Sequence, residues 1–162
     1  MESEGIIGGR LISQDFGGLE LLLSFYIRRV NIAVSRHLDK KLSGLDVAKG
    51  TGKIGTLLIV SRHPGISPSE VADIILRDRS SMGRLLVRME AQGLILRNVS
   101  PHDQRSLALY LTPAGHRLAE KVIQLTRQQD DEFFYMVTAS EKETMIHVCD
   151  KILNCYQSEV SI

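Results

Sequence analysis

The stretch that decides the fold is SPSEVADIILRDRSSMGRLLVRMEAQG, residues 67–93. Ser67 suits a helix N-cap, Pro68 suits the first helical position, and Glu70 lies three residues after the cap. Together they form a capping box, in which side chains at both ends satisfy the free N–H groups of the first helical turn. The pattern therefore predicts a helix that begins directly after Ser67.

A second helix is expected within the same stretch. Asp78 can cap it, and Gly93 can end it after about Gln92. Its apolar residues recur at helical spacing and make one face: Met82, Leu85, Leu86 and Met89. The other side carries Arg77, Ser80, Ser81, Arg84 and Arg88. Two short helices in this order are typical of a helix-turn-helix, whose second helix can enter a DNA major groove.

A hairpin is expected next. Residues 94–99 and 107–111 have the composition of strands, and the Ser-Pro-His-Asp-Gln segment between them is typical of a turn. Thr112 and Pro113 then favour the start of another helix. A helix-turn-helix followed by a hairpin is a winged helix, and Arg105 near the hairpin tip could reach a narrow minor groove.

From about Leu19 to the C-terminus, the chain resembles the MarR family of bacterial transcription regulators. The matching segments are Gly44-Leu45, His63 to Ser67, Val71-Ala72, Asp78 to Ser81, Met89 to Ile95, Asp103 to Arg105 and Leu111 to Gly115. The resemblance implies a mainly α fold with a small β-hairpin: a winged helix-turn-helix plus long N- and C-terminal dimerisation helices.

The chain departs from the family pattern at two places. The family often has a glycine and then an apolar residue in the turn between the two helices, where this chain has Leu76 and Arg77. We therefore expect the first helix to run on into the turn. Gln104 stands where the wing often has a basic residue, which predicts a weaker phosphate contact there.

The charge is unevenly distributed. The net charge of the 162 residues is only +1, but residues 77–105 hold six arginines against three acidic residues. Residues 120–162 hold four basic and eight acidic residues. A basic middle and an acidic end suit a protein that presents one face to phosphates. No apolar run is long enough to span a bilayer and no signal-peptide pattern is present, so a soluble, cytoplasmic protein is expected.

The expected organisation has three parts. Residues 1–16 are expected to be flexible, residues 53–112 to form the winged-helix lobe, and residues 19–43 and 113–162 to form dimerisation helices. The last of these helices is expected to start at a capping box of Ser140 and Glu143. The lobe cannot cover the apolar stripes of the long helices, so a homodimer is expected, with two recognition helices about one DNA turn apart.

The candidate DNA-binding residues lie on the second helix, around its turn and on the wing: Ser67, Arg77, Arg79, Ser80, Ser81, Arg84, Arg88, Asp103 and Arg105. Arg84 is the candidate for a bidentate contact to guanine, and its alternative is a surface ion pair with Glu90 or Asp78. Arg88 could equally interact with the C-terminal end of the helix dipole. The resemblance implies that Asp103 fixes the wing and that Arg105 contacts the minor groove.

The resemblance also implies a cleft for a small aromatic or acidic ligand. Candidate residues are Arg28, Arg29, Arg36 and His37 on the long first helix, with Lys53 as a further cation. The alternative for each is an ordinary solvated position. The Lys-Gly-Thr-Gly-Lys segment at 49–53 lacks the residues of a phosphate-binding loop and is interpreted as a loop and helix start.

Cys149 and Cys155 are six residues apart on one expected helix, so they point in different directions and are interpreted as core residues. No metal site, cofactor site or catalytic set is expected. The sequence thus predicts a homodimeric repressor that binds double-stranded DNA and is released by a small molecule. Two alternatives stay open: an oxidant sensor that uses Cys149 or Cys155, and a winged helix that binds only protein partners.

Overall fold

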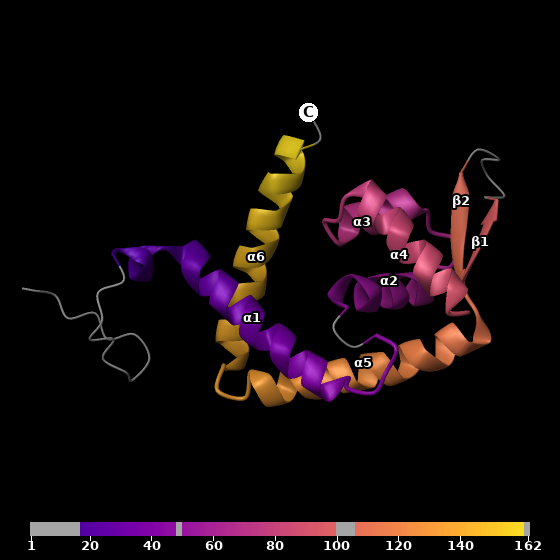
Figure 1. The fold of residues 1–162 in the computed structure, drawn as a ribbon. Helices are drawn as coiled ribbons and strands as arrows, with labels where there is room; N and C mark the ends of the chain where they lie inside the picture. Colours follow the sequence, from indigo (N-terminus) through magenta and orange to yellow (C-terminus); the bar gives the residue numbers. More distant parts are fainter. Residues whose placement is uncertain (1–16, 48–49, 100–105, 161–162) are drawn as a thin grey trace, which may run out of the picture. The chain divides into compact units, whose positions relative to one another are not determined.

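The structure is a computed structural model that describes residues 17–47, 50–99 and 106–160 (Figure 1). Its elements are a 3₁₀ helix at Leu19–Leu21, then α1 (Leu23–Lys41), α2 (Thr51–Arg62), α3 (Pro68–Ile74), α4 (Arg79–Ala91), β1 (Ile95–Val99), β2 (Leu107–Leu111), α5 (Pro113–Phe133) and α6 (Ala139–Val160). The expected mainly helical fold with one hairpin is confirmed. Residues 1–16 and the wing tip with Asp103, Gln104 and Arg105 lie outside the described residues.

The chain divides into two units between Arg36 and His37. The first contains the 3₁₀ helix and most of α1. The long first helix expected from residue 19 is interrupted, because Leu22 adopts an extended backbone conformation between the 3₁₀ helix and α1. The second unit contains the remaining elements. The assignment of residues 53–112 to a DNA-binding lobe and of the flanking helices to dimerisation stays a prediction.

Helix α3 begins at the expected capping box. Ser67 Oγ accepts a hydrogen bond from the Glu70 N–H at 3.2 Å, and the Ser67 N–H donates to Glu70 Oε2 at 2.9 Å. The helix does not run on into the turn, so that expectation is wrong. Leu76 takes a left-handed conformation with φ of 51°, and Arg77 N–H donates to the carbonyl of Ala72 at 2.8 Å. Leu76 thus ends α3 in a position that usually favours glycine.

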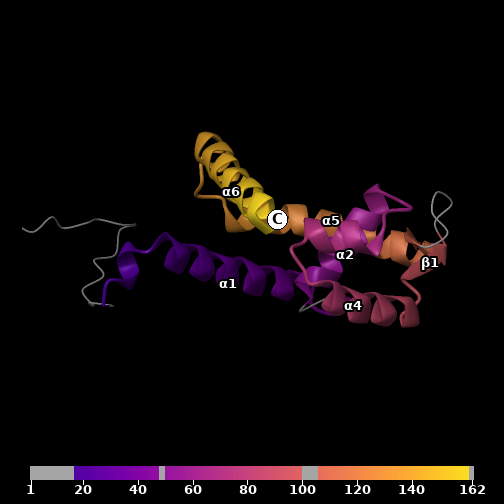
Figure 2. The same ribbon diagram turned by 90° about the horizontal axis from the view of Figure 1, so that it is seen from above.

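Helix α4 has the boundaries that its caps predict. Asp78 Oδ1 accepts a hydrogen bond from the Ser81 N–H at 2.7 Å. At the other end Gly93 has φ of 66°, and the N–H of Leu94 donates to the carbonyl of Met89 at 3.0 Å. Figure 2 shows α4 along the edge of the group that it forms with α2 and the hairpin. One side of α4 therefore packs inward and the other faces outward.

The hairpin is anchored to the helices at its base. Strand β1 pairs antiparallel with β2, with Ile95 opposite Leu111. The chain after α2 bonds to β2 as well, because Gly65 N–H donates to the Leu109 carbonyl and Leu109 N–H donates to the Ile66 carbonyl. Thr112 then caps α5 by accepting a hydrogen bond from the Gly115 N–H at 3.0 Å.

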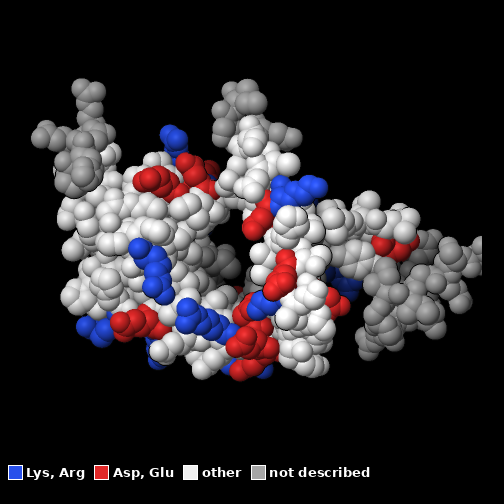
Figure 3. Space-filling view, turned by 180° about the vertical axis from the view of Figure 1, so that it is seen from behind, with Lys and Arg blue, Asp and Glu red and all other residues white. Residues whose placement is uncertain are grey.

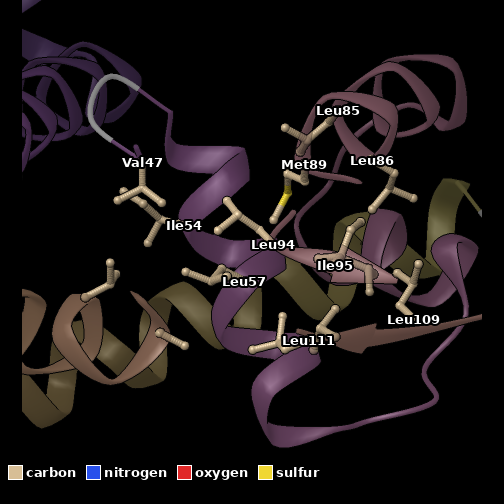
Figure 4. Packing of buried hydrophobic residues seen from close by; sticks show 14 of the residues in the cluster. Val47, Ile54, Leu57, Leu85, Leu86, Met89, Leu94, Ile95, Leu109 and Leu111 are labelled. Carbon is tan, nitrogen blue, oxygen red and sulfur yellow. The ribbon is translucent and has the colours of Figure 1, made fainter. Parts of the chain in front are cut away.

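A continuous apolar core joins α2, α4, the hairpin and α5. Figure 4 shows Leu57 of α2 near Leu94 and Leu111, with Leu86 and Met89 of α4 above them, and all five belong to one buried cluster. All four apolar residues predicted for the inner face of α4 are buried: Met82, Leu85, Leu86 and Met89. Burial of an apolar side chain of this size stabilises a fold by about 1.5–3 kcal/mol, so these residues fix how α4 is oriented in the second unit.

Helix α5 packs on α2 and exposes a charged outer side. Figure 3 shows basic and acidic side chains interspersed along the edge that α5 forms. Mixed charge of this kind does not make a uniformly basic surface, so this side is a poor candidate for phosphate contacts.

Helix α6 begins two residues before the predicted position. Thr138 Oγ1 accepts a hydrogen bond from the Glu141 N–H at 3.3 Å, and the Thr138 N–H donates to Glu141 Oε2 at 2.8 Å. The predicted box at Ser140 and Glu143 is therefore wrong. Thr138 with Glu141 and Ser140 with Glu143 both have the spacing of a capping box, but Ser140 already lies within the helix. None of the described helices is long and apolar enough to cross a membrane.

Candidate nucleic-acid interface

The outward side of α4 is the candidate DNA-binding surface. Its exposed residues follow helical spacing opposite the buried face: Arg79, Ser80, Gly83, Arg84, Val87 and Arg88. Ser81 is half-buried and lies in the first turn. Arginine and serine side chains on an exposed helix face can donate hydrogen bonds to phosphates and to base edges.

The Arg84 side chain is held in place by two serines. Its Nη1 donates to Ser80 Oγ at 2.8 Å and its Nη2 donates to Ser81 Oγ at 2.9 Å. These contacts do not neutralise the charge of the guanidinium, whereas an ion pair would. The two carboxylates considered as alternative partners bond elsewhere, because Asp78 caps α4 and Glu90 bonds to Arg97. Arg84 is thus oriented on the surface with its charge available to an anionic partner.

The cap of α4 is itself electrostatically favourable. The hydrogen bonds that Asp78 accepts from Ser81 lower the pKa of the Asp78 carboxyl, and the charge of Arg84 adds a smaller effect in the same direction. A negative charge at a helix N-terminus also interacts favourably with the helix dipole. Ser67 plays the same kind of role for α3, since its hydroxyl accepts the Glu70 N–H and lies 3.0 Å from Ser69 Oγ.

Arg77 does not share the outward face of Ser81 and Arg84, so that expectation is wrong. A Cβ atom placed on Gly52 would lie 2.1 Å from Arg77 Nη1 and 3.6 Å from Leu85 Cδ2. The guanidinium therefore lies against α2, on the same side of α4 as the buried Leu85. Arg77 precedes the N-cap of α4, so helical spacing does not set its direction. Its Nε is buried and bonds to no described atom.

The base of the wing is tied to α4 by an ion pair that the sequence analysis missed. Arg97 on β1 donates from Nε to Glu90 Oε2 at 2.8 Å, and its Nη2 bonds to the same oxygen. The hydrogen bonds from Arg97 lower the pKa of the Glu90 carboxyl. The available signal was a glutamate in the last turn of a helix and an arginine on the strand that follows it. The pair joins the hairpin to α4.

The candidate ligand residues are divided between the two units. Arg28 and Arg29 belong to the first unit, where both are exposed and the Arg29 guanidinium lies 5.2 Å from the centroid of the Phe25 ring. Arg36, the last residue of that unit, is also exposed. His37 belongs to the second unit, with its ring 5.5 Å from that of Phe133 and its Nδ1 buried without a described partner.

Lys53 has a local structural role. Its Nζ donates to the carbonyl of Asp46 and to Oε1 of Gln92, so it joins the segment before α2 to the end of α4. Burial lowers the pKa of the Lys53 ammonium; the Arg88 charge lowers it further, and the Asp46 charge opposes both effects. An anionic ligand would have to compete with both of the oxygens that Lys53 already contacts.

Both cysteines are exposed on α6, so their interpretation as core residues is wrong for the single chain. The large apolar side chains of the same helix are exposed as well, as expected of a stripe that the rest of the chain does not cover: Met145, Ile146, Val148, Ile152, Leu153 and Tyr156. Within the part of the chain that the structure describes, no three His, Cys, Asp or Glu side chains are grouped to hold a metal ion.

Comparison with known proteins identifies the family. Residues 43–106 match the model of the MarR family. The multiple antibiotic resistance protein MarR of Salmonella typhimurium is 32% identical over 129 residues, which span 78% of this chain and 88% of that protein. The chain belongs to the MarR family. It is a MarR-family transcriptional regulator with a winged-helix fold.

Solved MarR-type structures show the same architecture. A mutant of MarR from Escherichia coli in complex with operator DNA is 27% identical to this chain, with a TM-score of 0.74 over 86% of this chain and 99% of that one. PcaV from Streptomyces coelicolor, in complex with its natural ligand, is 19% identical, with a TM-score of 0.75 over 84% of this chain and 94% of that one. At 19% identity, the comparison with PcaV shows only that the two proteins share a fold.

Proposed function

We propose that this MarR-family regulator binds double-stranded operator DNA as a homodimer and represses transcription until a small ligand releases it. Helix α4 enters the major groove, where Arg84 contacts guanine, and Arg105 on the wing contacts the minor groove. The observation that carries the proposal is Arg84: it lies on the outward face of α4, held by Ser80 and Ser81 and paired with neither Asp78 nor Glu90.

The other proposed DNA contacts are inferred from where each residue lies on α3 and α4. Arg79 and Arg88 lie on the exposed side of α4, where their guanidinium groups could donate hydrogen bonds to phosphates. Ser67 caps α3 at the start of the helix-turn-helix. Arg77 makes no direct DNA contact in this proposal, because its guanidinium packs against Gly52.

The exposed stripe of α6 supports the homodimer. Ile152 and Tyr156 are one helical turn apart and are 46% and 53% exposed. A row of large apolar side chains on a long helix needs a partner, and a two-fold copy of the same helix is the simplest one. The dimer would place two copies of α4 at successive major grooves.

Release by a ligand would be a shift between two arrangements of the dimer. The ligand would be a small aromatic or acidic molecule, and its candidate contacts stay separate: Arg28 and Arg29 in the first unit, and His37 in the second. It would favour a spacing of the two lobes that no longer matches successive grooves. In support, the structural relative PcaV is described with its natural ligand. The protein would act in the cytoplasm, where its DNA lies.

A binding titration on the DNA that flanks its own gene tests the proposal. We expect binding to weaken steeply as salt rises, because phosphate contacts release counterions. A panel of aromatic acids should release the DNA, and Cys149→Ser and Cys155→Ser variants should be released equally well. Absence of salt-dependent DNA binding would favour a winged helix for protein partners, and release by oxidants that requires a cysteine would favour the oxidant sensor.

A further inference from the structure

Gly83 in the middle of α4 has no structural reason to be glycine in the described chain. The structure places four glycines inside α-helices, and three of them have close neighbours. A Cβ on Gly52 would meet Arg77, one on Gly55 would meet Ile75 at 3.1 Å, and one on Gly115 would meet the Leu94 carbonyl at 2.1 Å. Apart from its chain neighbours and the backbone of its own helix, a Cβ on Gly83 would meet no described atom within 4 Å.

A glycine at an exposed helical position is unfavourable for folding. It loses more backbone entropy than alanine and lowers helix stability. Gly83 does not end α4, because the helix continues to Ala91, and it has no positive φ. The fold therefore does not require glycine at position 83. A binding partner that approaches the helix backbone closely would require it.

Val87 lies one turn after Gly83 on the same side of α4 and is 53% exposed. Together Gly83 and Val87 form an apolar notch, by which we mean the uncovered backbone at Gly83 and the methyl groups of Val87, which line the same hollow. A hollow in the surface is lined here by Ser80, Gly83, Arg84, Val87 and Arg88. The Arg84 side chain bonds back toward Ser80 and Ser81, at the N-terminal side of the notch.

We infer that this apolar notch receives the C5-methyl group of a thymine in the major groove, beside the guanine that Arg84 contacts. This inference rests on the proposed function. The thymine methyl is the apolar group that the major-groove edge of a base pair presents, and it is read by contact with small apolar side chains. A Cβ at position 83 would occupy the space that the methyl group needs. Gly83 and Val87 would thus determine specificity for a T·A pair next to a G·C pair.

The test uses a duplex that the wild-type full-length protein selects from a random-sequence pool. Each thymine is replaced in turn by deoxyuridine, which removes only the methyl group. We expect one thymine in each half-site at which the replacement weakens wild-type binding about threefold to fivefold, the effect of one buried methyl group. Val87→Ala should bind the thymine duplex more weakly and lose most of that difference.

Gly83→Ala provides an independent measurement. We expect it to raise the thermal midpoint, because alanine favours the helix, and to weaken binding to the selected duplex at least as much as Val87→Ala does. Ala91→Gly makes the reverse change at an exposed position of the same helix, and should lower the midpoint and leave binding unchanged. Equal binding by Gly83→Ala and wild type, or a deoxyuridine effect that persists in Val87→Ala, would overturn the inference. If the wild type selects no sequence and shows no salt-dependent binding, the proposed function fails instead.

Discussion

Gly52 and Arg77 are in direct contact where α2 begins: a Cβ atom at position 52 would lie only 2.1 Å from Arg77 Nη1. Arg77 follows Leu76, whose left-handed backbone ends α3, and it precedes Asp78, which caps α4. The arginine in the turn of the helix-turn-helix thus packs on α2. Through this contact the turn is fixed to the core rather than to the DNA-binding face.

Gly52→Ala and Gly115→Ala should differ in their effect on stability. The atom that opposes a Cβ at Gly52 is the end of a flexible arginine, which can move away, so Gly52→Ala should change the free energy of unfolding by less than about 1 kcal/mol. The atom that opposes a Cβ at Gly115 is the backbone carbonyl of Leu94, which cannot move alone. Gly115→Ala should destabilise by about 1–3 kcal/mol, the usual cost of overpacking. Urea unfolding of the two variants measures both effects, and equal values would contradict this account.

Local chemistry made much of this fold predictable from the sequence. Ser67, Asp78 and Gly93 fixed helix ends because caps depend on residues a few positions apart. The inward face of α4 followed from its spacing. The direction of Arg77 and the ion pair of Glu90 with Arg97 were not predictable, because both depend on tertiary packing. The cap of α6 was not predictable either, because Thr138 and Ser140 offer equivalent local signals. The exposure of Cys149 was not predictable for a similar reason. An apolar stripe indicates a face that packs against something, but it does not show whether the same chain or a second copy covers it.

The Glu90–Arg97 pair should contribute to acid sensitivity. Arg97 lowers the pKa of Glu90 in the folded protein. The stabilising contribution is therefore fully present above the ordinary glutamate pKa of about 4.3, and it is lost as the pH falls from there through the lower folded pKa. Glu90→Gln and Arg97→Ala should each flatten the dependence of stability on pH in that window, measured by urea unfolding. The double variant should flatten it no further, and additive effects would show that the two groups act independently.

Ile152→Glu should separate the subunits of the proposed homodimer. Light scattering at micromolar concentration should give twice the chain mass of 18.1 kDa for the wild type and the chain mass for the variant. A buried unpaired charge is strongly unfavourable at an apolar interface. Asn154→Glu adds the same charge at an exposed polar position of α6 and serves as the control. A wild-type protein that is monomeric under these conditions would contradict the prediction.

The wing should supply affinity more than sequence preference. Arg105→Ala should weaken binding to all duplexes and reduce the slope of the logarithm of affinity against the logarithm of salt concentration by about one. Arg127→Ala removes an exposed arginine from the mixed-charge surface of α5 and should leave that slope unchanged. An altered base preference with an unchanged slope would show that Arg105 reads sequence instead.

Arg84→Ala should remove sequence discrimination at one base pair of each half-site. The wild-type protein should prefer the selected duplex over one in which that G·C pair is replaced by A·T, and a bidentate arginine contact is worth roughly 1–3 kcal/mol of such discrimination. The variant should bind both duplexes alike, with little change in stability, because an exposed helix position tolerates alanine. Arg84→Lys keeps the charge and loses the planar fork, so it should retain the salt dependence of the wild type and still lose much of the discrimination. If Arg84→Ala continues to discriminate between the two duplexes, another residue of α4 reads that pair, and the helix lies in the groove at a different angle from the one that the outward position of Arg84 implies.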